Sequence, residues 1–324
     1  MATKRSELID SANAGFYHLI SRCVRRTFLC GIDPDSGQSY EHRRGWIESR
    51  ILSLANLFSI EVYGYAVMHN HYHLVAYSDP LAPQQWSDEV VAEKWLTLYP
   101  GKLNDPARAQ QRAAKKAVII ADEVRLATYR ERLGSLSWLM RCINEPIAKQ
   151  SNAEDFCKGH FWESRFKSQA LLDEAAAITC MAYIDLNPIR AGIAKTPEES
   201  THTSIQHRLI HMTNEQLNEA VTSIAGKVRE KPLTIKLNDY IELVDWTGKQ
   251  IIHPGKGVIP AHLAPIFERL NLKQDQWLNQ VKAYGSHYYR AVGQFEQLMA
   301  KAKSLNQHWF KGIRAAKAFY SNPK

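Results

Sequence analysis

The chain has 324 residues, of which 45% are hydrophobic and 23% charged, and it carries a formal net charge of +8. These proportions are typical of a soluble globular protein, and the length predicts roughly two domains. No apolar run approaches the roughly 20 residues that span a bilayer, and the first residues lack the apolar core of a signal peptide. The five cysteines include no Cys-x-x-Cys pair, which disfavours a disulfide framework or zinc ribbon and predicts a cytoplasmic protein.

The first part of the chain alternates between strand-like and helix-like patterns. Residues 16–22 are strand-like, residues 42–58 carry apolar side chains at helical spacing, and residues 60–68 and 72–77 are strand-like around a tight turn. This order begins a ferredoxin-like βαββαβ domain, which belongs to the α+β class and has an antiparallel sheet with packed helices.

The pattern then changes. Residues 80–134 are rich in Pro, Gln, Ala and charge, which predicts a mostly helical insertion. A last strand is expected over residues 166–172. Asp173 is a good N-cap for a following helix, and Pro188 ends that helix.

Composition shifts to Lys, Thr, Pro, Glu and Ser around residues 194–203. We therefore expect one domain over residues 1–200 and a second, mainly helical and basic domain over residues 201–324. The second domain is interpreted as DNA-binding or accessory, because its net positive charge suits an acidic partner.

Basic side chains gather in two places. Between Val281 and Lys324, eight Lys and Arg residues stand against the single acidic residue Glu296. A second group comprises Arg108, Arg112, Lys115 and Lys116. The spacing of this second group places its members on one helical face. Such surfaces favour nucleic acid, with aromatic residues of the tail available for stacking on bases, although a solvated helix face is the alternative for each.

Three histidines alternate in the segment Met68-His-Asn-His-Tyr-His-Leu74. Because alternate strand residues point the same way, His71 and His73 can present two imidazoles to one cation, with Tyr72 turned to the opposite layer. Two half-buried structural histidines are the alternative. Imidazole ligands by themselves favour zinc, iron or nickel.

Tyr183 and Asn187 lie four residues apart at the end of the helix that follows Asp173, so they are expected to share a face. A phenol can be a nucleophile that holds a phosphoester, and an amide oxygen can complete a cation's shell of oxygen and imidazole ligands. The alternatives are a core tyrosine and a helix-terminal asparagine that Pro188 restricts.

Three separated motifs resemble those of one family. The histidine segment resembles the Met-Pro-Asn-His-x-His-Leu signature of the single-tyrosine HUH transposases. Two further motifs resemble those of the branch called REP-associated tyrosine transposases: Gly159-His-Phe-Trp-Glu-Ser-Arg-Phe-Lys167 and Tyr183-Ile-Asp-Leu-Asn-Pro-Ile-Arg-Ala-Gly192. The segment Tyr17-His-Leu-Ile-Ser-Arg22 is similar to the first strand of that family. The resemblance spans roughly residues 14–195. His69 stands where the family usually has Pro or another small residue, which leaves a pairing of His69 with His71 as a rival.

The resemblance implies that His71, His73 and Asn187 are metal ligands. It implies Tyr183 as the nucleophile and Mg²⁺ or Mn²⁺ as the metal. The implied activity is cleavage and rejoining of single-stranded DNA at palindromic REP hairpins through a 5′-phosphotyrosine link. Relatives can supply the tyrosine from a partner subunit, so a homodimer is among the expected assemblies.

In this interpretation, the candidates for contacts with DNA phosphates are arginines near the motifs and the basic stripe of the predicted helix at residues 108–116. The arginines are Arg22, Arg25, Arg26, Arg165 and Arg190. Two other functions stay open: a non-catalytic regulator that binds DNA hairpins, and a metal-dependent nuclease in which water attacks.

Overall fold

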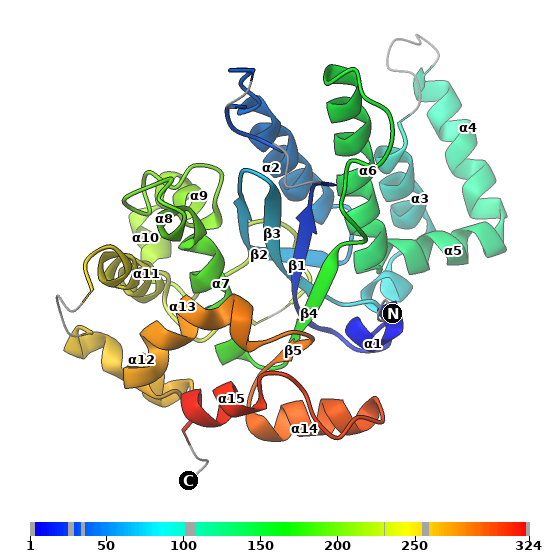
Figure 1. Cartoon of the computed structure of the whole chain (residues 1–324). Coiled ribbons are helices and arrows are strands. Elements are labelled where there is room, and N and C mark those ends of the chain that lie inside the picture. Colours follow the sequence, from blue (N-terminus) through cyan, green and yellow to red (C-terminus); the bar gives the residue numbers. More distant parts are fainter. Residues whose placement is uncertain are drawn as a thin grey trace.

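The computed structural model describes residues 4–24, 29–33, 36–100, 108–229, 231–254 and 259–321, without the side chains of residues 108 and 109. It has an α+β fold in which helices cover both faces of one central sheet (Figure 1). Among the helices in these ranges, none has both the length and the apolarity needed to cross a bilayer.

The sheet has five strands in the order β2-β3-β1-β4-β5. The strands are β1 (Gly15–Arg22), β2 (Ile60–Val67), β3 (His71–Ser78), β4 (Lys167–Leu171) and β5 (Ala291–Val292). The first four pair antiparallel to their neighbours, and β5 runs parallel to β4. With α2 (His42–Ala55) between β1 and β2 and α6 (Leu136–Glu154) between β3 and β4, the βαββαβ order matches the expected fold class.

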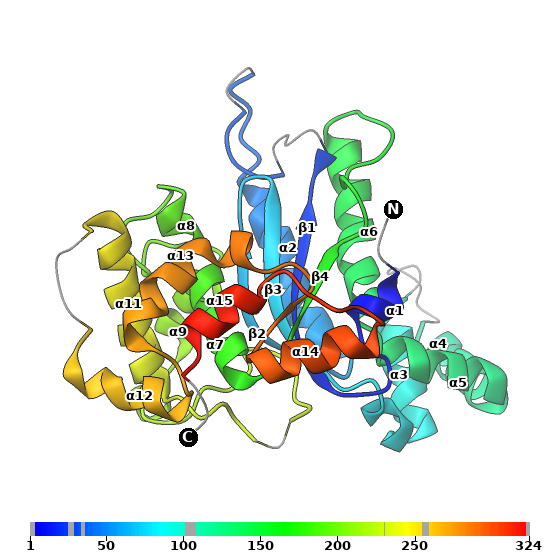
Figure 2. The same ribbon diagram turned by 60° about the horizontal axis from the view of Figure 1, so that its bottom comes forward.

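The two faces of the sheet carry different helices. Tyr72 lies between the two histidines of β3 in sequence, and its hydroxyl donates to Asn144 Oδ1 of α6 over 2.7 Å. Asn144 in turn donates to Ser21 Oγ of β1 over 2.9 Å, so α6 covers the Tyr72 face. The opposite face is covered by α7 (Glu174–Asp185), which contacts β1, β2, β3 and β4. Figure 2 shows α7 and the C-terminal helices in front of the sheet, with α2 and α6 behind it.

Close approach of α7 to the sheet depends on a glycine in β2. A Cβ atom placed on Gly64 would lie 3.0 Å from Ile184 Cδ1 and 3.3 Å from Ser204 Oγ. A larger residue at this position would therefore require the Ile184 and Ser204 side chains to give way.

The region after α7 packs on the same sheet. It contains α8 (Asn187–Arg190), α9 (Ser204–His211), α10 (Asn214–Leu217), α11 (Leu237–Ile252), α12 (Ala264–Arg269), α13 (Trp277–His287), α14 (Phe295–Ser304) and α15 (Ile313–Phe319), with short 3₁₀ turns at Ala261–Leu263 and Gln274–Gln276. Its buried residues belong to the same hydrophobic cluster as those of the sheet. The buried carboxylate of Asp185 accepts hydrogen bonds from Ile205 N over 3.0 Å and from the Tyr240 hydroxyl over 2.5 Å. The boundary expected at residue 200 therefore does not separate two hydrophobic cores.

Helices fill the segment between β3 and α6. They are a 3₁₀ turn at Ala82–Gln85, α3 (Asp88–Leu98), α4 (Arg108–Ala121) and α5 (Glu123–Leu133); a further short helix, α1 (Arg5–Leu8), precedes β1. This insertion has a small core of its own, where Trp95 stacks on Tyr129 with ring centroids 3.9 Å apart.

Candidate active site

His71 and His73 project from β3 onto the α7 face. Their Nε2 atoms lie 3.0 Å apart, and His73 is only 3% exposed. In the pairing of β1 with β3, His73 lies opposite Ile20 and His71 opposite Arg22. His69 is exposed at the turn and its ring lies near Gly31, so the structure brings together His71 and His73 rather than His69 and His71.

Both imidazoles of the pair favour the neutral form. Burial, with the adjacent positive charge of Arg22, lowers the pKa of His71 to about 4. Burial and the neighbouring His71 lower the pKa of His73 well below its ordinary value. Neutral imidazole is the form that binds a metal ion, so the two rings are ready to act as ligands at neutral pH.

Tyr183 lies beside this pair. Its ring centroid is 5.8 Å from that of His73, and it stacks on Tyr284 of α13 with centroids 4.8 Å apart. The guanidinium carbon of Arg190 lies 4.9 Å from the centroid of the Tyr183 ring. A Cβ atom on Gly285 would lie 3.0 Å from the Tyr183 hydroxyl oxygen, so this glycine keeps the space next to the hydroxyl open.

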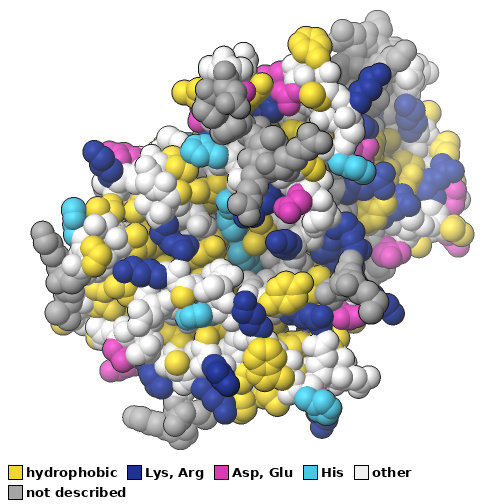
Figure 3. All heavy atoms as spheres, viewed as in Figure 1, with side chains coloured by type: hydrophobic (Ala, Val, Ile, Leu, Met, Phe, Trp, Pro, Cys, Tyr) yellow, Lys and Arg dark blue, Asp and Glu magenta, His cyan; other side chains and the backbone are white. Residues whose placement is uncertain are grey.

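A pocket of about 460 Å³ is lined by His71, His73, Tyr183 and Tyr284, among others. Its basic lining residues are Arg5, Arg22, Arg165 and Lys167, and its acidic lining residue is Glu163. Burial and the nearby guanidinium of Arg165 lower the pKa of Arg5 to about 10, as expected where like charges gather. Figure 3 shows Lys and Arg side chains around histidines near the middle of this face. The pocket therefore suits an anion such as a phosphate.

Asn187 lies outside the helix that contains Tyr183. The helix that contains Tyr183 ends at Asp185, and Asn187 is the first residue of α8. Asn187 does not line the pocket, and its Nδ2 is buried without a hydrogen-bond partner. The expectation that Tyr183 and Asn187 share one continuous helix is therefore wrong, because the helix is interrupted at Leu186, two residues before Pro188. The role of Asn187 as third metal ligand stays a prediction.

The arginines expected to contact DNA have different positions. Arg22 and Arg165 line the pocket, and Arg190 lies over Tyr183 while donating to the Lys282 carbonyl over 2.8 Å. Arg25 and Arg26 lie outside the described residues.

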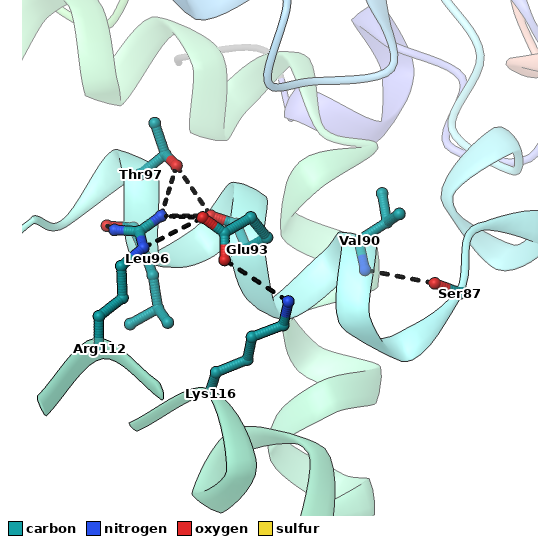
Figure 4. Close-up of polar contacts among 7 residues, drawn as sticks. All are labelled: Ser87, Val90, Glu93, Leu96, Thr97, Arg112 and Lys116. Atoms are coloured by element: carbon teal, nitrogen blue, oxygen red, sulfur yellow. Dashed lines mark hydrogen bonds and ion pairs between the residues drawn. The ribbon is translucent and has the colours of Figure 1, made fainter. Parts of the chain in front are cut away.

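The helical stripe on α4 has another set of partners. Arg112 donates from Nε to Glu93 Oε1 over 3.0 Å and from Nη2 to Thr97 Oγ1 over 2.9 Å, and Lys116 Nζ lies 3.6 Å from Glu93 Oε2 (Figure 4). These contacts hold α4 against α3. Lys115 is exposed, and the side chain of Arg108 is not described.

Three residues of the site were not predicted to belong to it, and Tyr284 was expected only as one of the tail aromatics that could stack on bases. His18 Nε2 lies 2.8 Å from His73 Nδ1, Gln169 Oε1 lies 3.2 Å from His18 Nδ1, and Tyr284 stacks on Tyr183. The sequence could have indicated His18, because alternate residues of a strand point the same way and His18 therefore shares a face of β1 with Arg22. Gln169 and Tyr284 become visible only once β4 and α13 are placed.

The histidine pair fits a six-coordinate cation. Two neighbouring ligands about 2.1 Å from an octahedral ion lie about 3.0 Å apart, which is the separation of the two Nε2 atoms. Within the described ranges, no group of three or more His, Cys, Asp and Glu side chains is placed to hold a metal ion. Further ligands of a cation held by His71 and His73 would therefore be expected from other groups, such as an amide oxygen, water or a phosphate.

Comparison with protein families and with curated proteins finds no match for this chain. Among solved structures, the chain is similar to "Structure of the REP associates tyrosine transposase bound to a REP hairpin", with 12% sequence identity and a TM-score of 0.39. The similarity covers 73% of this chain and 98% of that one. At this level the likeness assigns no activity and no residue role to the chain.

Proposed function

We propose that this protein is a metal-dependent single-stranded DNA endonuclease and strand transferase that uses Tyr183 as its nucleophile. The observation that carries the proposal is the position of Tyr183, with its ring 5.8 Å from that of His73, in a pocket lined by four basic residues. A REP-type hairpin is proposed as the substrate on the resemblance of the sequence motifs.

The proposed reaction exchanges one phosphoester for another. Tyr183 Oη attacks the phosphorus, the bond from phosphorus to the 3′ oxygen breaks, and a 5′-phosphotyrosine forms. The phenol releases its proton and the departing 3′ oxygen takes one up, which leaves a 3′-hydroxyl. Attack by a 3′-hydroxyl on the phosphotyrosine reverses these steps, so rejoining consumes no nucleotide.

The basic residues are suited to bind and orient the phosphate. Arg22 and Lys167 have no carboxylate partner among the residues that the structure describes, so their charge is available to a ligand. Arg190 places a further positive charge against the Tyr183 ring and favours the developing phenolate. Mg²⁺ or Mn²⁺ held by Nε2 of His71 and His73 would polarise the phosphate oxygens.

Adduct formation tests the nucleophile. The protein is incubated with Mn²⁺ and a hairpin oligonucleotide that has a single-stranded flank and a 3′ label, because the label must stay on the fragment joined to tyrosine. We expect a labelled adduct that survives denaturation with the wild type and none with Tyr183→Phe. Tyr289→Phe is the matched control, since Tyr289 lines the same pocket and is 60% exposed.

Each other outcome favours a different function. An undiminished adduct with Tyr183→Phe, and its loss with Tyr289→Phe, would move the nucleophile to Tyr289. Cleavage by the wild type without any adduct would favour attack by water, and hairpin binding without cleavage would favour the non-catalytic regulator.

A further inference from the structure

We propose that His18 and Gln169 are positioning residues, which form a hydrogen-bond chain from the backbone carbonyl of Tyr289 to His73 and hold His73 in the tautomer with a free Nε2 lone pair. The inference rests on the proposed function in one respect, because it takes His73 Nε2 as a metal-binding atom. It adds a link from the C-terminal region to the metal-binding pair.

The first link fixes the amide of Gln169. The atom that faces the Tyr289 carbonyl oxygen, at 3.4 Å, is Gln169 Nε2. A carbonyl oxygen only accepts hydrogen bonds, so the amide nitrogen must take this position. The other end of the amide, Oε1, then faces His18 Nδ1 at 3.2 Å.

The second link fixes the proton of His18. An amide oxygen only accepts, so Nδ1 of His18 must carry the hydrogen. In the neutral imidazole with its hydrogen on Nδ1, Nε2 carries a lone pair and is an acceptor. This acceptor lies 2.8 Å from His73 Nδ1, which therefore donates to it.

The third link reaches the metal-binding atoms. With its hydrogen on Nδ1, the neutral His73 ring has a lone pair on Nε2. His71 has the same tautomer, because its Nδ1 lies 2.6 Å from the amide oxygen of Asn70. Two lone pairs then face each other across 3.0 Å, an arrangement that a cation between them stabilises.

The start of the chain is held by the fifth strand. Ala170 N donates to the Arg290 carbonyl over 2.9 Å, and Leu172 N donates to the Val292 carbonyl over 2.8 Å. Because Tyr289 immediately precedes Arg290, the pairing of β5 with β4 places the Tyr289 carbonyl next to Gln169. The buried imidazole of His18, 3% exposed, thus has a partner on each nitrogen.

The test measures Mn²⁺ affinity by calorimetry without DNA, and the tautomer of His73 by ¹⁵N NMR in the metal-free protein. We expect the Nδ1–H form of His73 in the wild type. His18→Phe keeps a ring of similar size and should weaken Mn²⁺ binding by about 10- to 100-fold, the usual effect of losing a partner of a ligating histidine.

Two further variants separate positioning from packing. His18→Gln can place an amide oxygen near the position of the lost Nε2, and we expect it to recover most of the affinity and the Nδ1–H signal. Gln169→Leu leaves His18 in place but removes its fixed acceptor, so His73 should populate both tautomers. His207→Phe is the control, because His207 lies on α9 outside the pocket.

The proposal is overturned if His18→Phe and Gln169→Leu both bind Mn²⁺ as tightly as the wild type with the His73 tautomer unchanged. If His18→Phe does not fold, Gln169→Leu decides alone by the same two measurements. Neither measurement involves DNA or Tyr183. An absent adduct together with the expected tautomer and affinity changes would refute strand transfer alone, and the reverse pattern would refute the positioning chain alone.

Discussion

The pocket and the helical insertion both combine arginine, lysine and aromatic side chains, but their charges are compensated differently. In the insertion, Arg112 and Lys116 share the carboxylate of Glu93, and Arg130 is paired with Asp88. In the pocket, Arg22 and Lys167 have no such partner within the described part of the chain. The spacing of cations in a sequence identifies a helix face, whereas a site for an anion requires positive charge that no neighbouring carboxylate neutralises.

The largest expected effect is on the stability of the insertion, and it should leave metal binding in the pocket unchanged. Trp95→Ala should reduce the free energy of unfolding of the insertion by about 3–5 kcal/mol, because it removes a buried ring from a small core. Mn²⁺ affinity should stay unchanged, since the histidine pair belongs to the other core. Urea unfolding followed by helical circular dichroism, together with calorimetry, measures both quantities.

Trp309→Ala is the control for Trp95→Ala, because Trp309 is 58% exposed. We expect its unfolding free energy to lie within about 0.5 kcal/mol of the wild type. A loss of Mn²⁺ binding in Trp95→Ala would show that the insertion supports the site, and would end the contrast between the two regions.

A smaller effect is expected in the pocket. Arg22→Ala should weaken hairpin binding roughly five- to tenfold near 0.1 M salt and lower the slope of log affinity against log salt by about 0.7–0.9, as for one lost phosphate contact. Fluorescence anisotropy over a salt series measures both. An unchanged slope would mean that Arg22 does not neutralise a phosphate.

The local sequence pattern was sufficient to predict the first strands, the turn between β2 and β3 and the helix that follows Asp173. Asp173 accepts from Ala176 N over 2.7 Å, as an N-cap does, and His71 and His73 share one face because alternation in a strand is a local property. The end of this helix before Pro188 was predicted, whereas the second short helix that begins at Asn187 was not.

The features that were not predicted from the sequence depend on contacts between distant segments of the chain. His18 reaches His73 through the pairing of β1 with β3, which sequence spacing does not define. Tyr284 reaches Tyr183 only because α13 packs on α7. Two residues of β5 extend the sheet by a parallel pairing with β4, an element too short to leave a pattern in the sequence.

The smallest expected effect concerns the stripe on α4. Arg112→Ala should lower the free energy of unfolding by about 0.5–1 kcal/mol, because it removes a partly exposed ion pair with Glu93. Hairpin affinity and its salt slope should stay as in the wild type, since this positive charge is already neutralised. Lys115→Ala is the matched control: Lys115 is exposed on the same helix, and we expect no change in stability. A reduced salt slope in Arg112→Ala would show that DNA displaces Glu93, and would place the insertion on the DNA surface together with the pocket.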